Sequence, residues 1–149
     1  MNNQTLLCFD YGEKRIGVAV GQTVTSTATA LQTIPVINKK PNWEMINRLI
    51  VEWEPDKFIV GHPFTLEGAR QKMTDAAERF GRQLEHRFKI PVDLIDERLS
   101  SYEARRELKS TRKLDPVSAR LILETWFREN KNIRYRQIDS NNLRKSLMI

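Results

Sequence analysis

Residues 6–20 read LLCFDYGEKRIGVAV, and the rest of the chain is organised around this stretch. An apolar run ends at Asp10, turns at Gly12 and continues as a second apolar run over residues 15–20, which predicts a β-hairpin. We expect Gly12 to take the turn with a positive φ, which glycine adopts without steric cost. Side chains alternate along a strand, so Asp10 lies on an otherwise apolar face. Such an aspartate either forms the turn by bonding its own backbone or serves a functional site.

Composition favours a single compact domain with a polyanionic partner. The chain has 149 residues, 40% of them hydrophobic, and its 25 Lys and Arg against 19 Asp and Glu give a net charge of +6. This basic excess favours nucleic acid as the partner and says nothing about the fold. Cys8 is the single cysteine, so no disulfide forms within the chain, as in a reducing cytoplasm. No apolar run approaches the ~18 residues of a membrane helix, and we expect a soluble cytoplasmic protein.

Beyond the hairpin, the hydrophobic pattern predicts strands that alternate with helices. Expected strands cover residues 30–34, 57–60 and 90–95, and expected helices cover residues 43–53, 73–88, 100–109 and 116–127, with loops at 39–42 and 110–114. Asn42 is expected to cap the first helix, and the charged face of the second is expected to contact solvent. This order predicts an α/β layered domain over residues 1–130. Residues 131–149 form a basic, weakly periodic tail that we expect to be flexible.

Acidic residues recur where the predicted elements end. They are Asp10, the pair Asp96 and Glu97, and Asp115. Carboxylates that converge in the fold could hold two divalent cations ~3.5–4 Å apart, one activating a water and the other stabilising the leaving oxygen of a phosphodiester. Mg²⁺ and Mn²⁺ are hard cations that suit such oxygen ligands.

Each of these residues also has a structural explanation. Asp115 precedes Pro116 and would cap a helix, which is worth ~1 kcal/mol. Glu97 could form a surface ion pair with Arg98. His62 is expected to be a loop or packing residue rather than a catalytic base. The residues alone leave a metal site and a set of structural acids as open alternatives.

Four motifs, taken together, resemble one known family. They are DYGEKRIGVAV at residues 10–20, IVGHP at 59–63 followed by Gly68, DERLSS at 96–101, and Asp115 before Ser118 and Ala119. In this order they resemble the YqgF family of bacterial RNase H-like proteins, assigned as pre-16S rRNA nucleases and earlier as Holliday junction resolvases. The resemblance implies an RNase H-like α/β fold with a mixed five-stranded sheet flanked by helices. In that sheet, an antiparallel meander of strands 1–3 is followed by parallel strands.

The resemblance also implies a nuclease of the two-metal type that processes the 5′ end of precursor 16S rRNA in ribosome biogenesis. The implied catalytic and metal-binding acids are Asp10, Glu97 and Asp115, with Asp96 as the alternative to Glu97 and with Mg²⁺ or Mn²⁺ as the cofactor. The implied contacts to substrate phosphates come from Lys14, Arg15 and Arg98.

The chain departs from the family pattern in the loop after Gly61. This loop reads HPFTLEG, so His62 and Thr65 stand where the family usually has Leu and Asn. The 110–114 loop is also short for the family. Both departures concern contacts to the substrate and leave the three acids intact.

Three other functions fit parts of the pattern. A Holliday junction resolvase would use the same chemistry but would need a dimer, and the sequence identifies no dimer face, which leaves a monomer or a weak dimer. A non-catalytic RNA-binding module would use the acids structurally, and its RNA binding would survive Asp10→Asn. A nucleotide-binding fold of the actin and sugar-kinase type also opens with an Asp-x-Gly hairpin, but it needs a second half that 149 residues do not supply.

Overall fold

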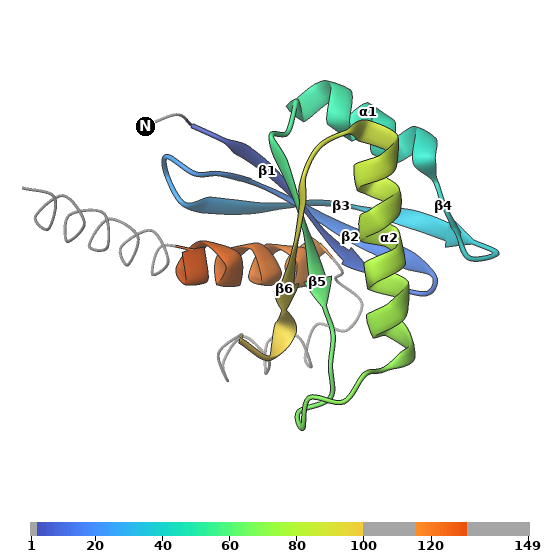
Figure 1. Ribbon diagram of the computed structural model, residues 1–149. Helices are drawn as coiled ribbons and strands as arrows, with labels where there is room; N and C mark the ends of the chain where they lie inside the picture. The colour runs from blue at the N-terminus through green and yellow to red at the C-terminus, as the bar shows by residue number, and fades with distance from the viewer. Residues whose placement is uncertain (1–2, 100–115, 131–149) are drawn as a thin grey trace, which may run out of the picture.

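One mixed sheet forms the centre of the fold in the computed structural model, which describes residues 3–99 and 116–130 (Figure 1). Within these residues, six strands lie in the order β4-β3-β2-β1-β5-β6. Their bounds are β1 Thr5–Tyr11, β2 Arg15–Gln22, β3 Thr27–Ile37, β4 Lys40–Pro41, β5 Lys57–His62 and β6 Val92–Asp96. Strands β1 to β4 pair antiparallel, whereas β5 is parallel to both β1 and β6. The carboxyl ends of β1, β5 and β6 therefore meet at one end of the sheet.

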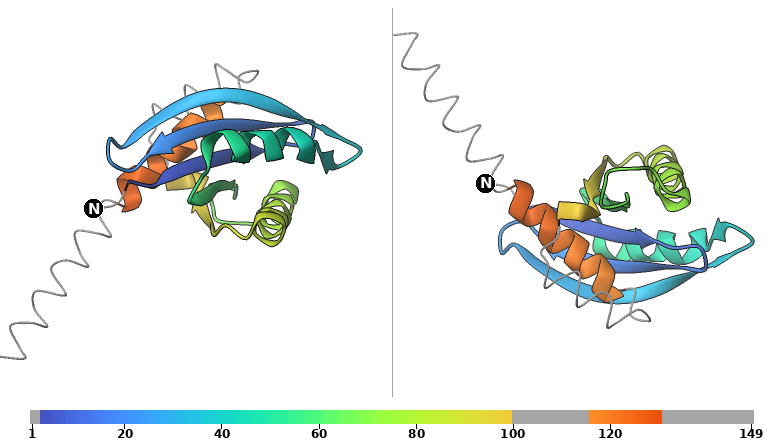
Figure 2. Two further views of the ribbon diagram at one scale, coloured as in Figure 1. Left: turned by 90° about the horizontal axis from the view of Figure 1, so that it is seen from above. Right: turned by 90° about the horizontal axis from the view of Figure 1, so that it is seen from below.

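Helices cover both faces of the sheet (Figure 2). α1 (Trp43–Trp53) and α2 (Lys72–Phe88) lie on one face, and a helix formed by residues 116–130 lies on the other. Asn42 caps α1, as expected, by accepting a hydrogen bond of 3.1 Å from the backbone N–H of Met45. Among the described residues, no helix is both long enough and apolar enough to cross a membrane.

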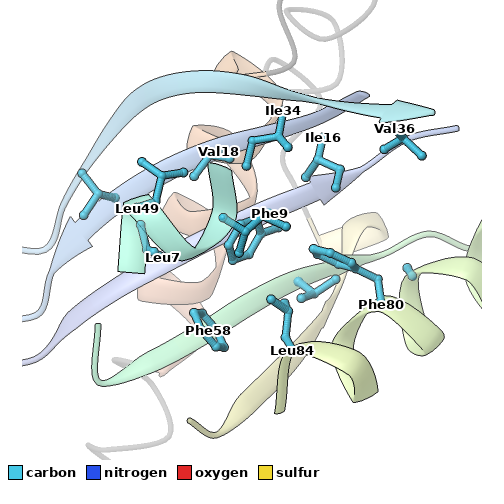
Figure 3. Close-up of a cluster of buried hydrophobic side chains, with 14 residues drawn as sticks. Leu7, Phe9, Ile16, Val18, Ile34, Val36, Leu49, Phe58, Phe80 and Leu84 are labelled. Atoms are coloured by element: carbon cyan, nitrogen blue, oxygen red, sulfur yellow. The ribbon is translucent and has the colours of Figure 1, made fainter. Parts of the chain in front are cut away.

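Alternating apolar side chains of the strands divide between two cores, one on each face. The larger core lies under α1 and α2, where the rings of Phe9 and Phe80 meet edge to face with their centroids 5.5 Å apart (Figure 3). The smaller core contains Leu6, Cys8, Ala19, Ile59, Ile95, Ala119, Ile122, Leu123 and Trp126. Asp10 follows Leu6 and Cys8 in the same alternation, so its side chain lies on the face covered by the helix of residues 116–130.

The structure confirms the α/β architecture and the antiparallel meander, but the sheet within the described residues has six strands instead of five. The extra strand is β4, because Lys40 and Pro41 pair with Ile37 and Val36 instead of forming a loop. Asn38 and Lys39 make the turn with φ values of 52° and 62°. A turn of this kind is usually signalled by Asn followed by Gly, and Lys39 stands here in place of the glycine.

The prediction for Gly12 is also wrong, because Gly68 and not Gly12 has a positive φ, of 89°. A Cβ at position 12 would lie 2.5 Å from the carbonyl oxygen of Arg15, so glycine is needed there for close backbone approach. The last described helix runs to residue 130, beyond its expected end at residue 127. The predicted helix 100–109, the 110–114 loop, Asp115 and the 131–149 tail lie outside the described residues.

Candidate active site

Parallel strands bring Asp10 and Glu97 to the same end of the sheet. Asp10 is the next-to-last residue of β1, and Glu97 directly follows Asp96, the last residue of β6. β5 lies between these two strands, and its Gly61 pairs with Ile95 of β6. Residues separated by more than eighty positions in the chain thus share one site.

A cavity of about 110 Å³ opens at this end, between the sheet and the helix of residues 116–130. It is lined by Asp10, Ile95, Asp96, Glu97, Ser118, Leu121, Ile122 and Thr125. The buried hydroxyl of Thr125 donates to the Leu121 carbonyl at 2.9 Å, so its hydrogen is used within the helix. The sheet side of the cavity supplies the carboxylates, and the helix side is largely apolar.

Gly61 makes room for the carboxylate of Glu97. A Cβ at position 61 would overlap Oε1 of Glu97 and would lie 2.7 Å from Cδ1 of Ile122. Any side chain at this position would therefore push Glu97 away from the strands or push the helix off the sheet. Gly61 sets how closely Glu97 approaches the strand that carries Asp10.

Burial controls the protonation of Glu97. Burial, and then the charge of neighbouring Asp96, raises the pKa of Glu97 from its ordinary 4.5 to about 7. The pKa of the Cys8 thiol is raised mainly by burial and further by the charges of Asp10 and Glu97, which places both carboxylates near this one residue. The ionised form of Glu97 is disfavoured here, and a cation bound beside it would favour that form.

Asp96 and Glu97 are neighbours in the chain but have different surroundings. Arg98 donates to both carboxylate oxygens of Asp96, from Nη2 to Oδ2 at 2.6 Å and from Nε to Oδ1 at 3.1 Å. This hydrogen bonding is the main cause of the lowered pKa of Asp96. Both acids line the cavity, but Arg98 holds Asp96 as an anion, whereas the pKa of Glu97 is raised.

The loop between β5 and α2 holds Arg98 from its other side. The guanidinium carbon lies 5.3 Å from the centroid of the Phe64 ring. A Cβ on Gly68 would come within 2.8 Å of Nη1 of Arg98, so the glycine allows this contact as well as the positive φ of the turn. Thr65 closes the turn, because its Oγ1 accepts from the Ala69 N–H at 2.9 Å.

His62 belongs to an ion-pair network behind this loop. Its Nε2 lies 2.8 Å from Oε1 of Glu78, and its ring meets Phe64 edge to face at 4.4 Å. Arg70 donates to the other oxygen of Glu78 at 2.8 Å and also binds Asp75. These contacts match the expected loop and packing role of His62, because they anchor the loop to α2.

Comparison with known proteins identifies the family. A family model described as "RuvX: Holliday junction resolvase" matches residues 4–129. The chain belongs to the RuvX family. Two relatives named "Putative pre-16S rRNA nuclease" come from Saccharophagus degradans, at 44% identity over 139 residues, and from Buchnera aphidicola subsp. Baizongia pistaciae, at 47% over 135 residues. The first match covers 87% of this chain and 97% of the relative, and the second covers 85% and 98%. The predicted YqgF resemblance is confirmed.

Solved structures support the fold of this RuvX chain. Thermus thermophilus RuvC, in complex with a Holliday junction substrate, aligns with a TM-score of 0.55 at 15% sequence identity. The alignment covers 86% of this chain and 96% of that one. At an identity this low, the comparison shows the fold alone. The structural alignment confirms the predicted RNase H-like fold.

The donor set of this RuvX chain fits a hard divalent cation. Asp10 and Glu97 offer carboxylate oxygens, the ligands that Mg²⁺ and Mn²⁺ prefer. Within residues 3–99 and 116–130, no three Cys, His, Asp or Glu side chains form a group that could hold a metal ion. The third predicted acid, Asp115, lies outside these residues.

The remaining predicted residues lie on the rim of this end. Lys14 and Arg15 are exposed at the turn between β1 and β2, just beyond Asp10. Sequence reasoning missed the role of Gly61, although a glycine at the end of a buried strand is itself a signal of close approach. It also missed the apolar wall supplied by Leu121 and Ile122.

Proposed function

We propose that this chain is a metal-dependent nuclease that processes the 5′ end of precursor 16S rRNA. One observation carries the proposal, namely the placement of Asp10 and Glu97 around one cavity, with Gly61 leaving space for the Glu97 carboxylate. The names of relatives at 44% and 47% identity support this substrate over other phosphodiesters. We assign the nuclease to a domain of residues 1–130, with residues 131–149 as a basic tail.

Asp10, Glu97 and Asp115 would hold Mg²⁺ or Mn²⁺ in this proposal. Two such ions, when bound, supply an activated water and stabilise the charge of the leaving oxygen. Glu97 contributes a half-buried carboxylate whose ionised form a bound cation would favour. The apolar wall of the helix of residues 116–130 limits water at the cavity and strengthens these electrostatic contacts.

Cations on the rim would orient the substrate phosphates. Lys14 and Arg15 are exposed and can reach a phosphate that crosses the strand ends. Arg98 is held by Asp96 and Phe64, so its position is fixed before the substrate binds. In this proposal Asp96 positions Arg98, and Glu97 binds the metal ion.

The first experiment measures cleavage of labelled precursor 16S rRNA and of a four-way DNA junction, side by side. Each substrate is incubated with Mg²⁺, with Mn²⁺ or with EDTA, using wild type, Asp10→Asn and the control Glu52→Gln, an exposed acid on α1. Metal-dependent trimming of the RNA that is lost only in Asp10→Asn supports the proposal.

A Holliday junction resolvase is the second candidate, favoured by the description of the matching family model. Symmetric nicking of the junction, without trimming of the RNA, would establish that function instead. RNA binding without cleavage of either substrate would indicate a non-catalytic RNA-binding module.

A further inference from the structure

The second half of α2 and its C-terminal cap carry an unusual concentration of positive charge. Residues 79–89 contain four Lys and Arg side chains against the single acid Glu85. The four cations are Arg79, Arg82, Arg87 and Lys89, and all four are exposed. Together with Gln83 and His86 they line an open surface groove that has no carboxylate in its lining.

Most arginines elsewhere in the described structure lie against carboxylates. The pairs are Arg48 with Glu44 at 2.7 Å, Arg70 with Glu78 at 2.8 Å, Arg98 with Asp96 at 2.6 Å and Arg120 with Glu124 at 3.5 Å. Within residues 3–99 and 116–130, the side chains of Arg79, Arg82 and Lys89 make no hydrogen bond or ion pair with a carboxylate. Arg87 lies over the ring of Trp43 at 4.1 Å. Charge that the fold leaves uncompensated on one surface attracts an anionic partner.

This groove continues toward the candidate active site. A second cavity, of about 270 Å³, shares Arg79 and Gln83 with the groove and is also lined by Tyr11, Lys39 and Lys72. Its lining includes two acids, Glu13 and Asp75, of which Glu13 lies 3.7 Å from Lys72 and Asp75 binds Arg70.

Tyr11 connects this surface to the acids. It directly follows Asp10 on β1, so their Cα atoms lie about 3.8 Å apart while their side chains lie on opposite faces of the sheet. α2 and the helix of residues 116–130 occupy these two faces (Figure 2). A polymer that crosses the end of β1 could therefore contact the acids on one face and the cations on the other.

We propose that Lys39, Lys72, Arg79, Arg82, Arg87 and Lys89 form a track, here called the α2 track, that binds the phosphate backbone of the nucleic acid whose cleavage is proposed above. An extended polyanion fits better than a small ligand, because the 17 residues of α2 alone span about 25 Å. The inference rests on the proposed function for the identity of the polymer. It assigns that polymer a second contact surface, on the face of the sheet opposite the one that carries Asp10.

The test measures binding separately from cleavage. Fluorescence anisotropy in EDTA follows a labelled single-stranded RNA with the sequence of the precursor 5′ leader, titrated with wild type and with Arg79→Gln/Arg82→Gln. Each phosphate contact on a single strand is worth about fivefold in affinity at 0.1 M salt relative to 1 M, because log K falls with log salt with a slope of about −0.7 per contact. We expect the double variant to bind about 25-fold more weakly at 0.1 M salt and to show a slope shallower by about 1.4.

Two control variants sharpen this test. Arg48→Gln removes an exposed arginine from α1, which is paired with Glu44, and should change affinity less than about twofold. Arg79→Lys/Arg82→Lys keeps both charges and should restore most of the binding. Thermal unfolding of each variant confirms that the protein used in the titration is folded.

The outcomes separate this inference from the proposed nuclease. If the double variant binds with wild-type affinity and salt slope, the α2 track does not contact nucleic acid, whether or not the protein cleaves RNA. If wild type binds the RNA through the track but never cuts it, the track stands and the proposed nuclease fails. An absence of RNA binding by wild type would overturn both.

Discussion

Two groups of acids flank the carboxyl end of β5, and the fold treats them in opposite ways. Glu78, behind the loop, receives hydrogen bonds from Arg70 and His62, and these lower its pKa to about 2. Glu97, at the strand ends, is half-buried beside Asp96, and its pKa is raised to about 7. The same residue type is thus stabilised as an anion in one place and disfavoured as an anion in the other.

This difference in pKa distinguishes acids that stabilise the fold from acids of the candidate site. A carboxylate that already has its cations within the chain needs no further partner, so Glu78 and Asp75 hold the loop to α2. A carboxylate whose charge is costly in the folded protein is a candidate for a functional site, and our proposal places a cation beside it. Asp96 resembles the first group, because Arg98 binds it.

The largest expected effect is on catalysis. Glu97→Gln should lower the rate of metal-dependent RNA trimming by more than about 100-fold, because loss of even a residue that only hydrogen-bonds to a metal ligand costs about 10–100-fold. Glu78→Gln should stay within about threefold of wild type, because its contacts lie behind the loop. Single-turnover rates at saturating Mg²⁺ test both variants. An equal loss of cleavage rate in the two variants would show that catalysis does not depend on Glu97 more than on Glu78.

The second prediction concerns stability against pH in EDTA. The folded protein keeps a proton on Glu97 that the unfolded chain releases above pH 4.5, so stability should fall as pH rises from about 4.5 to about 7. A difference of this size between the two pKa values corresponds to at most about 3.4 kcal/mol. Glu97→Gln, which stays neutral, should lack this fall and should be more stable than wild type at pH 8. Urea unfolding at a series of pH values measures the difference.

Metal provides the control for this pH dependence. Adding Mg²⁺ at pH 8 should raise the stability of wild type and should have a much smaller effect on Glu97→Gln, since a bound cation stabilises the folded state. Parallel pH curves for the two proteins in EDTA would show that Glu97 is not buried as an acid with a raised pKa.

The third prediction tests how Gly61 positions Glu97. Gly61→Ala places a Cβ against Oε1 of Glu97 and within 2.7 Å of Cδ1 of Ile122, which should cost about 1–3 kcal/mol as overpacking. Gly81→Ala on α2 is the matched control, because its Cβ would meet Val92 at an ordinary 3.4 Å and alanine favours the helix by up to about 1 kcal/mol. Denaturant unfolding distinguishes the two substitutions. A Gly61→Ala protein as stable and active as wild type would contradict the close fit.

Local signals in the sequence predicted the parts of the fold that depend on neighbours in the chain. The hairpin of β1 and β2 and the cap at Asn42 follow from patterns within a few residues. The turn at Asn38 and Lys39 was missed because neither residue is the glycine that usually marks a positive φ.

The candidate site was predicted only in part, because its geometry depends on distant residues. The motifs named Asp10 and Glu97, but no pattern separated Glu97 from Asp96. That distinction arises from the register of β5 with β6 and from the absence of a Cβ at Gly61. The α2 track depends likewise on tertiary structure, since the sequence alone does not reveal which charges find partners.

The smallest expected effect comes from the loop acids. Glu78 has a lowered pKa, so its contribution to stability is present above about pH 4.5 and is lost as pH falls toward 2. Glu78→Gln should be slightly less stable than wild type at pH 6, and the difference between the two proteins should shrink as pH falls from about 4.5 toward 2. Glu52→Gln, at an exposed position on α1, is the matched control and should differ little from wild type at either pH. Urea unfolding at pH 6 and pH 3 gives the comparison, and a wild-type advantage over Glu78→Gln that is undiminished at pH 3 would mean that packing, and not the charge of Glu78, holds the loop. The sign of this pH dependence is opposite to that expected for Glu97. The two glutamates therefore report separately on the acids that stabilise the loop and on the acids that we propose to bind a cation.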